Sequence, residues 1–213
     1  MSAGTTAAPD TAPIAYDLEA HYRELEQKIT AAGIAADLGR VRAAFECADR
    51  AHSGQKRKDG SPYVSHCIAA AIITAEMGLD EDSIVAALLH DCTKKLDMDE
   101  QLALCRHYGI PLDELERKAL KLLHSKTGAA IARDVFAVDD DVYNAILYHT
   151  TGKPDMTLLE KIIYLADYIE PTRDFPGVEA LRRTVYEDLD RGLLMGLTMT
   201  IDEMEEMGNP VHH

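Results

Sequence analysis

The sequence has no tryptophan, and aromatic residues make up only 6% of the chain. Hydrophobic residues nevertheless account for 46% of its 213 residues, and Ala and Leu are the commonest of them. Small aliphatic side chains suit closely packed helices better than a sheet. No stretch alternates between apolar and polar residues for long enough to predict a strand. The composition therefore predicts an all-α fold with one domain, or one domain and a small extension.

Positive charge is also scarce, with 22 Lys and Arg against 37 Asp and Glu and a formal net charge of −15. This argues against a nucleic-acid binder, because such proteins present positive potential to phosphates. A small anionic ligand in a locally basic cleft remains compatible with the charge. No run approaches the ~20 apolar residues of a membrane span, so no membrane partner is expected.

The four cysteines form no CxxC pair and lie within segments predicted to be helical. This indicates reduced, packed thiols and a cytoplasmic location. Residues 1–13 are rich in Ala, Thr and Pro and lack the charged region and apolar core of a secretory signal. We expect a disordered tail over 1–13, an N-terminal helical extension over 14–53 and the main domain over 54–213.

Apolar spacing and Gly or Pro breaks predict a succession of helices. Residues 53–62 form the most basic and loop-like stretch between them. The acidic residues at 80–82 suit the start of a helix, where carboxylates meet the positive end of the helix dipole. The predicted helices cover 14–32, 35–52, 63–77, the segment from 80 to the His-Asp pair, 97–108, 112–123, 125–136, 139–149, 157–169 and 178–207.

The sequence Leu88-Leu89-His90-Asp91 ends an apolar run that begins at Ile84. Unpaired buried charge is costly, so the imidazole and the carboxylate both need a partner. A divalent metal would satisfy both, with nitrogen and oxygen ligands. An ordinary polar helix end would also satisfy them, and for an isolated His-Asp pair that is the commoner case.

Four other polar residues each lie within or beside an apolar segment of the sequence, namely His66, His124, His149 and Asp167. Taken singly, each is more often a core histidine or a hydrogen-bonded aspartate. Asp167 fits that interpretation least well, because a carboxylate in the middle of an apolar helix needs a partner. Taken together, they lie on separate predicted helices, which suits a site built in the core of a helical bundle.

Two histidines and two aspartates would form a mixed ligand set: His66, His90, Asp91 and Asp167. With positions left open, such a set favours Fe, Mn, Co or Ni over a closed structural zinc site. His124 and His149 would then either complete a second metal position that shares Asp91 or donate hydrogen bonds to a substrate phosphate. Several Lys and Arg residues flank these positions, some of them by chance. A metal beside such cations suits a phosphoryl or phosphodiester reaction.

These motifs resemble the HD-domain superfamily of metal-dependent phosphohydrolases, and within it the YqeK-type branch, which splits diadenosine tetraphosphate into two ADP. The resemblance spans about 64–211. It is carried by residues 148–178, by His90-Asp91-Cys92-Thr93-Lys94, by His124 with the following Gly128-Ala129, and by Asn209-Pro210-Val211. The main domain over 54–213 would accordingly be an HD-domain helical bundle.

The resemblance implies a divalent or trivalent transition metal, iron first, held by His66, His90, Asp91 and Asp167. His90, Asp91 and Asp167 would be catalytic, with Asp91 or Asp167 taking the proton of the attacking water. The implied substrate contacts are Lys94, His124, His149, Thr150, Arg173, Pro210 and Val211. The implied partner is a dinucleoside polyphosphate or another nucleotide.

Two departures bear on the substrate. Tyr63 stands where the branch usually has an Arg, and residues 51–63 are instead similar to the HD domain of guanosine tetraphosphate hydrolases of the RelA/SpoT type. In those proteins the basic loop contacts the nucleotide, so Arg57 is a candidate substitute contact. They also follow the His-Asp pair with a Glu-Asp pair, whereas this chain has Lys94-Lys95.

Our first hypothesis is therefore a metal-dependent pyrophosphohydrolase that cleaves diadenosine tetraphosphate symmetrically. The alternatives are a guanosine tetraphosphate-type or other nucleotide phosphohydrolase, and a nucleotide-sensing HD module with little turnover. The last predicted helix carries Met195, Met199, Met204 and Met207. These methionines suit packing against the core, and a homodimer contact is the alternative.

Overall fold

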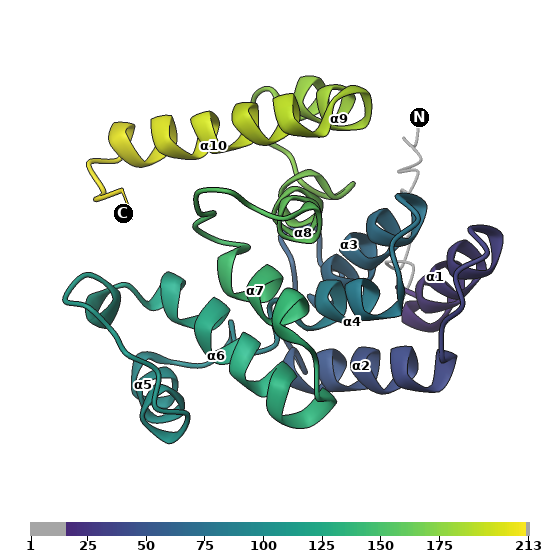
Figure 1. Ribbon diagram of the computed structural model, residues 1–213, viewed down its shortest axis with the longest axis horizontal. Coiled ribbons are helices and arrows are strands. Elements are labelled where there is room, and N and C mark those ends of the chain that lie inside the picture. The colour runs from purple at the N-terminus through teal and green to yellow at the C-terminus, as the bar shows by residue number, and fades with distance from the viewer. Residues whose placement is uncertain (1–15, 212–213) are drawn as a thin grey trace, which may run out of the picture.

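A computed structural model describes residues 16–211, and over that range it contains ten α-helices and no strand (Figure 1), which confirms the all-α prediction. The predicted tail over 1–13 lies outside the described residues. The helices are α1 (Leu18–Ala31), α2 (Leu38–Ala51), α3 (Val64–Glu76), α4 (Glu81–Leu89), α5 (Met98–His107), α6 (Leu120–Phe136), α7 (Asp140–Tyr148), α8 (Leu158–Ile169), α9 (Val178–Glu187) and α10 (Leu189–Glu206), with a 3₁₀ turn, η1, over Glu116–Lys118.

The centre of the molecule is α3, in which every residue from Val64 to Ala75 is buried. Helices α1 and α2 pack on α3 and α4, and the rings of Tyr22 and Phe45 stack there with centroids 4.6 Å apart. One continuous apolar core runs from α1 to α9. The division between an extension and a main domain at residue 53 stays a prediction. Over residues 16–211, no helix is long and apolar enough to cross a membrane.

Helix caps place two of the site residues. Asp80 caps α4 by accepting a hydrogen bond from the Ser83 N–H at 3.0 Å, and Asp139 caps α7 by accepting one from the Val142 N–H at 2.9 Å. An N-cap acceptor satisfies an amide that has no partner within the helix. Both helices are nine residues long. Each therefore ends directly before a site histidine, His90 after α4 and His149 after α7.

Two predicted helix boundaries are wrong. Residues 112–123 and 125–136 do not form two helices: the helical break lies at Ala119, and α6 continues through His124. Leu123, His124 and Ser125 are all buried, and no Gly or Pro interrupts the helix there. The predicted helix over 178–207 is divided at Asp188, which has extended backbone (φ −154°, ψ 105°) and caps α10 through the Arg191 N–H at 3.0 Å.

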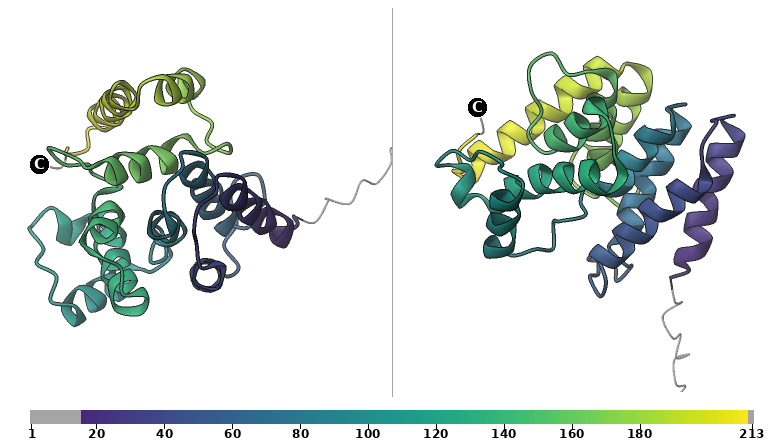
Figure 2. Two further views of the ribbon diagram at one scale, coloured as in Figure 1. Left: turned by 45° about the vertical axis from the view of Figure 1, so that its right-hand side comes forward. Right: turned by 60° about the horizontal axis from the view of Figure 1, so that its bottom comes forward.

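Helices α9 and α10 lie together across α8 on one side of the molecule (Figures 1 and 2). Their contact depends on Gly192, because a Cβ there would lie 2.6 Å from Val185 Cγ2 and 2.8 Å from Val185 Cα. A Cβ at Gly196, by contrast, would meet its nearest atom in Tyr168 at an ordinary 3.4 Å.

We expect Gly192→Ala to be less stable than Gly196→Ala by about 1–3 kcal/mol, the usual cost of overpacking. The gain in helix propensity from Gly to Ala is common to both variants and cancels in the comparison. Urea unfolding followed by circular dichroism measures the difference. Equal stability of the two variants would contradict the close approach of α9 and α10.

Candidate metal centre

Two histidines are oriented by hydrogen bonds to backbone carbonyls. His90 Nδ1 lies 2.7 Å from the Ala87 carbonyl oxygen, and His149 Nδ1 lies 2.7 Å from the Ile146 carbonyl oxygen. A carbonyl only accepts, so Nδ1 is the donor in each ring and Nε2 is the nitrogen left to face a metal. Metal-binding histidines are commonly held in this way, because the hydrogen bond selects the tautomer and the ring orientation.

The first donor group brings together the four predicted ligands, His66, His90, Asp91 and Asp167, with one donor atom from each within 4.8 Å of all the others. His66 Nε2 lies 3.3 Å from His90 Nε2 and 2.8 Å from Asp167 Oδ1. The Asp91 Oδ2 atom faces the same point, 3.6 Å from His90 Nε2. These residues come from α3, from the turn after α4 and from α8, so helix packing alone creates the group.

A second donor group consists of Asp91, His124 and His149. Asp91 Oδ1 lies 3.2 Å from His124 Nε2 and 3.5 Å from His149 Nε2, and the two nitrogens are 3.1 Å apart. Asp91 thus presents Oδ2 to the first group and Oδ1 to the second. The hydroxyl of Thr150 lies 3.2 Å from His149 Nε2 at the edge of this group.

The donor set fits a metal ion. Asp91 Oδ1 is buried and has no hydrogen-bond partner among residues 16–211. A buried carboxylate oxygen without a partner is strongly disfavoured. Imidazole nitrogens and carboxylate oxygens that converge on one point are ligands for transition metals. A cation at the second donor group would satisfy this oxygen.

Charge pairing keeps the two site aspartates ionised. Burial raises the pKa of Asp91, but the charges of His90 and Lys94 outweigh it and hold that pKa well below its usual range. For Asp167, burial again raises the pKa, and the Arg173 guanidinium outweighs it and lowers the pKa. Both side chains are therefore available as carboxylates at neutral pH.

The two cations predicted to contact phosphate are bound to these carboxylates. Lys94 Nζ lies 2.8 Å from Asp91 Oδ2, and Arg173 pairs with Asp167 Oδ1. Pro210 and Val211 follow α10 as exposed residues and do not line the cavity beside the metal centre. The structure therefore does not bring this predicted C-terminal segment to the site.

Two residues next to the ligands were missed as site residues in the sequence. Tyr63, noted only as a departure from the branch, donates its hydroxyl to Asp91 Oδ2 at 2.9 Å. Glu170 is fully buried and lies 3.1 Å from His66 Nδ1 through Oε1. The sequence feature that could have identified Glu170 as a site residue was its position as a charged residue directly after an apolar helix. Because Pro171 follows it, the sequence favoured a simple helix end.

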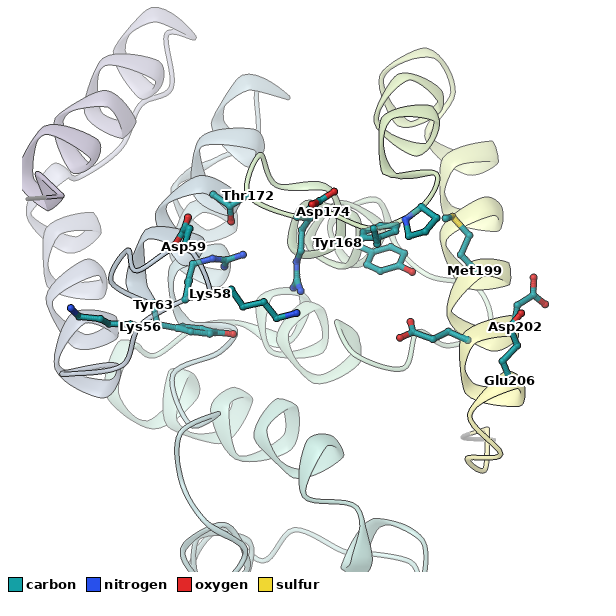
Figure 3. Close-up of a pocket in the computed structure, with 15 residues that line it drawn as sticks. Lys56, Lys58, Asp59, Tyr63, Tyr168, Thr172, Asp174, Met199, Asp202 and Glu206 are labelled. Atoms are coloured by element: carbon teal, nitrogen blue, oxygen red, sulfur yellow. The ribbon is translucent and has the colours of Figure 1, made fainter. Parts of the chain in front are cut away.

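A cavity of about 1130 Å³ lies beside the donor groups (Figure 3). Its walls come from residues 56–63, from residues 168–176 and from the second half of α10. Tyr63 and Arg173 line it and also contact Asp91 and Asp167, so the cavity adjoins the metal centre. Lys56 and Lys58 both line the cavity, and Lys58 extends toward its middle whereas the ammonium end of Lys56 points away from the middle (Figure 3). The stacked rings of Tyr168 and Phe175, 4.9 Å apart, form an aromatic wall.

The fold and the site together define a class, helical proteins in which His and Asp donors converge in the bundle core beside a cavity. The family model of the HD domain matches residues 63–172, which contain His66, His90, Asp91 and Asp167. The chain belongs to the HD domain family.

Similar proteins support this assignment. The symmetrical bis(5'-nucleosyl)-tetraphosphatase of Halalkalibacterium halodurans is 40% identical over 129 residues, which cover 60% of this chain and 68% of the relative. The protein of the same name from Bacillus subtilis is 38% identical over 128 residues, with the same coverage. A solved structure from Clostridium acetobutylicum, described as a predicted HD superfamily hydrolase involved in NAD metabolism, is 36% identical with a TM-score of 0.70 and covers 81% of this chain and 90% of its own.

A second type of relative matches a shorter part of the chain. The bifunctional (p)ppGpp synthase/hydrolase RelA of Mycobacterium tuberculosis is 43% identical over 81 residues. These residues cover 38% of this chain but only 10% of that protein. The similarity to RelA is therefore local, whereas the tetraphosphatases match over most of their length.

Proposed function

We propose that this protein is a metal-dependent phosphohydrolase that cleaves diadenosine tetraphosphate symmetrically into two ADP. The observation that supports it most is the position of Asp91, which serves two groups of His and Asp donors beside a cavity large enough for a nucleotide. The names of the tetraphosphatase relatives support the substrate.

The charges of the metal centre suit a polyphosphate. Three carboxylates, Asp91, Asp167 and Glu170, are each paired with a cation, respectively Lys94, Arg173 and Arg57. The side chains alone are thus nearly neutral, and a bound metal makes the centre positive within an otherwise acidic protein. That metal supplies positive charge to the phosphoryl oxygens. Local positive charge attracts and orients the phosphate chain.

The proposed roles follow from position. His66, His90, Asp91 and Asp167 hold the metal, which we propose to be iron, with Mn, Co and Ni as the alternatives that suit the same donors. His124, His149 and Thr150 face the second donor group and either hold a second ion or contact phosphate. Lys94 and Arg173 remain proposed phosphate contacts, each through the donors that its carboxylate leaves unused.

Lys58 is a further proposed phosphate contact, because it extends into the cavity (Figure 3). We expect Lys58→Gln to raise KM for diadenosine tetraphosphate about tenfold with little change in kcat, because a cation remote from the reacting atoms contributes uniform binding. Lys56→Gln removes the same charge from a side chain that points away, and its KM should stay near that of the wild type. Steady-state kinetics of the two variants decide this, and equal KM values would contradict the contact.

Product analysis tests the function. Purified full-length protein is incubated with diadenosine tetraphosphate or guanosine tetraphosphate, and the products are separated by chromatography. Two ADP per substrate support symmetrical cleavage, and AMP with ATP contradicts it. Preferential hydrolysis of guanosine tetraphosphate would favour the alternative suggested by residues 51–63. Tight binding without turnover would favour a nucleotide-sensing module.

Measurements on the same sample address the remaining predictions. Elemental analysis identifies the metal and its ratio to protein. Sedimentation analysis determines whether the chain forms a homodimer through α10. Met195 and Met199 of this helix pack against the core, and Met207, directly after its end, is 62% exposed. We also propose a cytoplasmic location, which is supported by four cysteines that form no disulfide.

A further inference from the structure

The loop between α2 and α3 contains three consecutive cations with different surroundings. Arg57 donates from a guanidinium nitrogen to Glu170 Oε1 at 2.8 Å, and its side chain is only 14% exposed. Its neighbours Lys56 and Lys58 are exposed, and Figure 3 shows them pointing away from the middle of the cavity and toward it, respectively. The loop therefore buries one of its three cations against a specific carboxylate.

A tight turn prepares this arrangement. The Gly60 N–H donates to the Arg57 carbonyl oxygen at 3.0 Å, and Gly60 has a φ of +89°. Asp59 Oδ1 accepts hydrogen bonds from both the N–H and the hydroxyl of Ser61, at 2.9 and 2.7 Å. The Arg57 N–H in turn donates to the Ser61 carbonyl oxygen at 2.9 Å. These bonds fix the backbone of Arg57 at a position from which its side chain reaches Glu170.

Glu170 connects Arg57 to a metal ligand. Its Oε1 atom, which accepts from Arg57, also lies 3.1 Å from His66 Nδ1 in an ion-pair contact that is bent away from a linear hydrogen bond. Glu170 itself is held by the N–H and the hydroxyl of Thr172, both at 2.8 Å. On the far side of the imidazole ring, His66 Nε2 faces the first donor group.

We propose that Arg57 is a positioning residue of the metal centre, which holds Glu170 against His66 and so directs the His66 Nε2 lone pair at the metal. A carboxylate on the remote nitrogen of a metal-binding histidine sets its tautomer and orientation. The carboxylate performs this role only while it is ionised and fixed, and in a buried position a guanidinium provides both conditions. Arg57 is thus committed to the metal centre, and the nucleotide is left to other cations.

The binding of manganese(II) to metal-stripped full-length protein, followed by electron paramagnetic resonance, tests this without any nucleotide. Removal of a partner of a metal ligand typically weakens binding 10–100-fold. We expect a loss of that size in Arg57→Gln and a smaller loss in Arg57→Lys, which keeps the charge. Lys56→Gln is the matched control from the same loop and should bind manganese as tightly as the wild type.

Helical content and urea unfolding of the metal-free variants separate positioning from folding. If Arg57→Gln is poorly folded, the comparison between Arg57→Lys and Lys56→Gln decides the question. Wild-type manganese affinity in a folded Arg57 variant, with only KM for the nucleotide raised, would overturn the proposal and make Arg57 a substrate contact. Absence of manganese binding by the wild type would also overturn it. Failure to hydrolyse diadenosine tetraphosphate would reject the proposed function alone, because this test contains no nucleotide.

Discussion

Asp91→Ala is expected to lose both its metal and its hydrolytic activity while the helices remain. Asp91 is the one residue common to the two donor groups, with Oδ2 facing the first and Oδ1 facing the second. Its removal takes an anionic ligand from both groups and leaves Lys94 unpaired beside the histidines. Loss of the several kcal/mol that a metal supplies lowers kcat by about 10³-fold or more.

Elemental analysis, turnover of diadenosine tetraphosphate and far-ultraviolet circular dichroism check this prediction together. Asp91→Asn keeps the size of the side chain and removes its charge, and we expect the same loss of metal from it. Asp174→Asn is the matched control, since this exposed carboxylate lines the cavity but belongs to neither donor group. Wild-type metal content or turnover in Asp91→Ala would contradict the assignment of Asp91 to both groups.

The second large expected effect is a loss of stability when Glu170 is replaced. Glu170→Ala leaves Arg57 without its carboxylate and removes the acceptor of Thr172 and the neighbour of His66 Nδ1. Breaking a buried ion pair by removing one partner typically costs about 3–5 kcal/mol, so we expect a loss of that size in the free energy of unfolding. Glu179→Ala, at an exposed pair with Arg182, should cost less than about 1 kcal/mol. Urea unfolding of metal-free protein compares the two, and equal losses would contradict this prediction.

The same carboxylate predicts a pH dependence. Burial raises the pKa of Glu170, but its contact with His66 and the hydrogen bonds from Thr172 outweigh it and lower the pKa to about 2. An unfolded Glu has a pKa of about 4.3, so between these values the unfolded chain binds the extra proton. The stability from ionised Glu170 is therefore complete above about pH 4.3 and is lost as the pH falls toward 2. The stability difference between wild type and Glu170→Gln should shrink over this window, and a constant difference from pH 6 to 3 would contradict it.

The proposed metal ligands could be picked out from the sequence because each is a polar residue within an apolar segment. His66 lies between Ser65 and Cys67 in a helix that is buried from Val64 to Ala75, and Asp167 follows Ala166 in α8. Burial of such groups demands a common partner, which a shared site provides. Helix ends were less predictable. Ala119 and Asp188 carry no Gly or Pro signal, and their breaks depend on local backbone geometry.

Pairings between distant segments could not be predicted in this way. Arg57 and Glu170 are separated by 113 positions, and Tyr63 and Asp91 by 28. In the sequence, the similarity of residues 51–63 to a nucleotide-contacting loop made Arg57 a candidate substrate contact. In the structure, its middle residue, Arg57, pairs instead with Glu170, which lies against His66.

The sequence alone determined that the chain is helical and which His and Asp residues need a partner, because both follow from periodicity and the cost of buried charge. Only the tertiary structure decided that Asp91 belongs to two donor groups, that Lys94 and Arg173 pair with Asp91 and Asp167, and that Arg57 and Lys58 have different surroundings. These outcomes depend on distances of a few Å between side chains of different helices. Helix packing sets those distances, and they cannot be inferred from the sequence around any single residue.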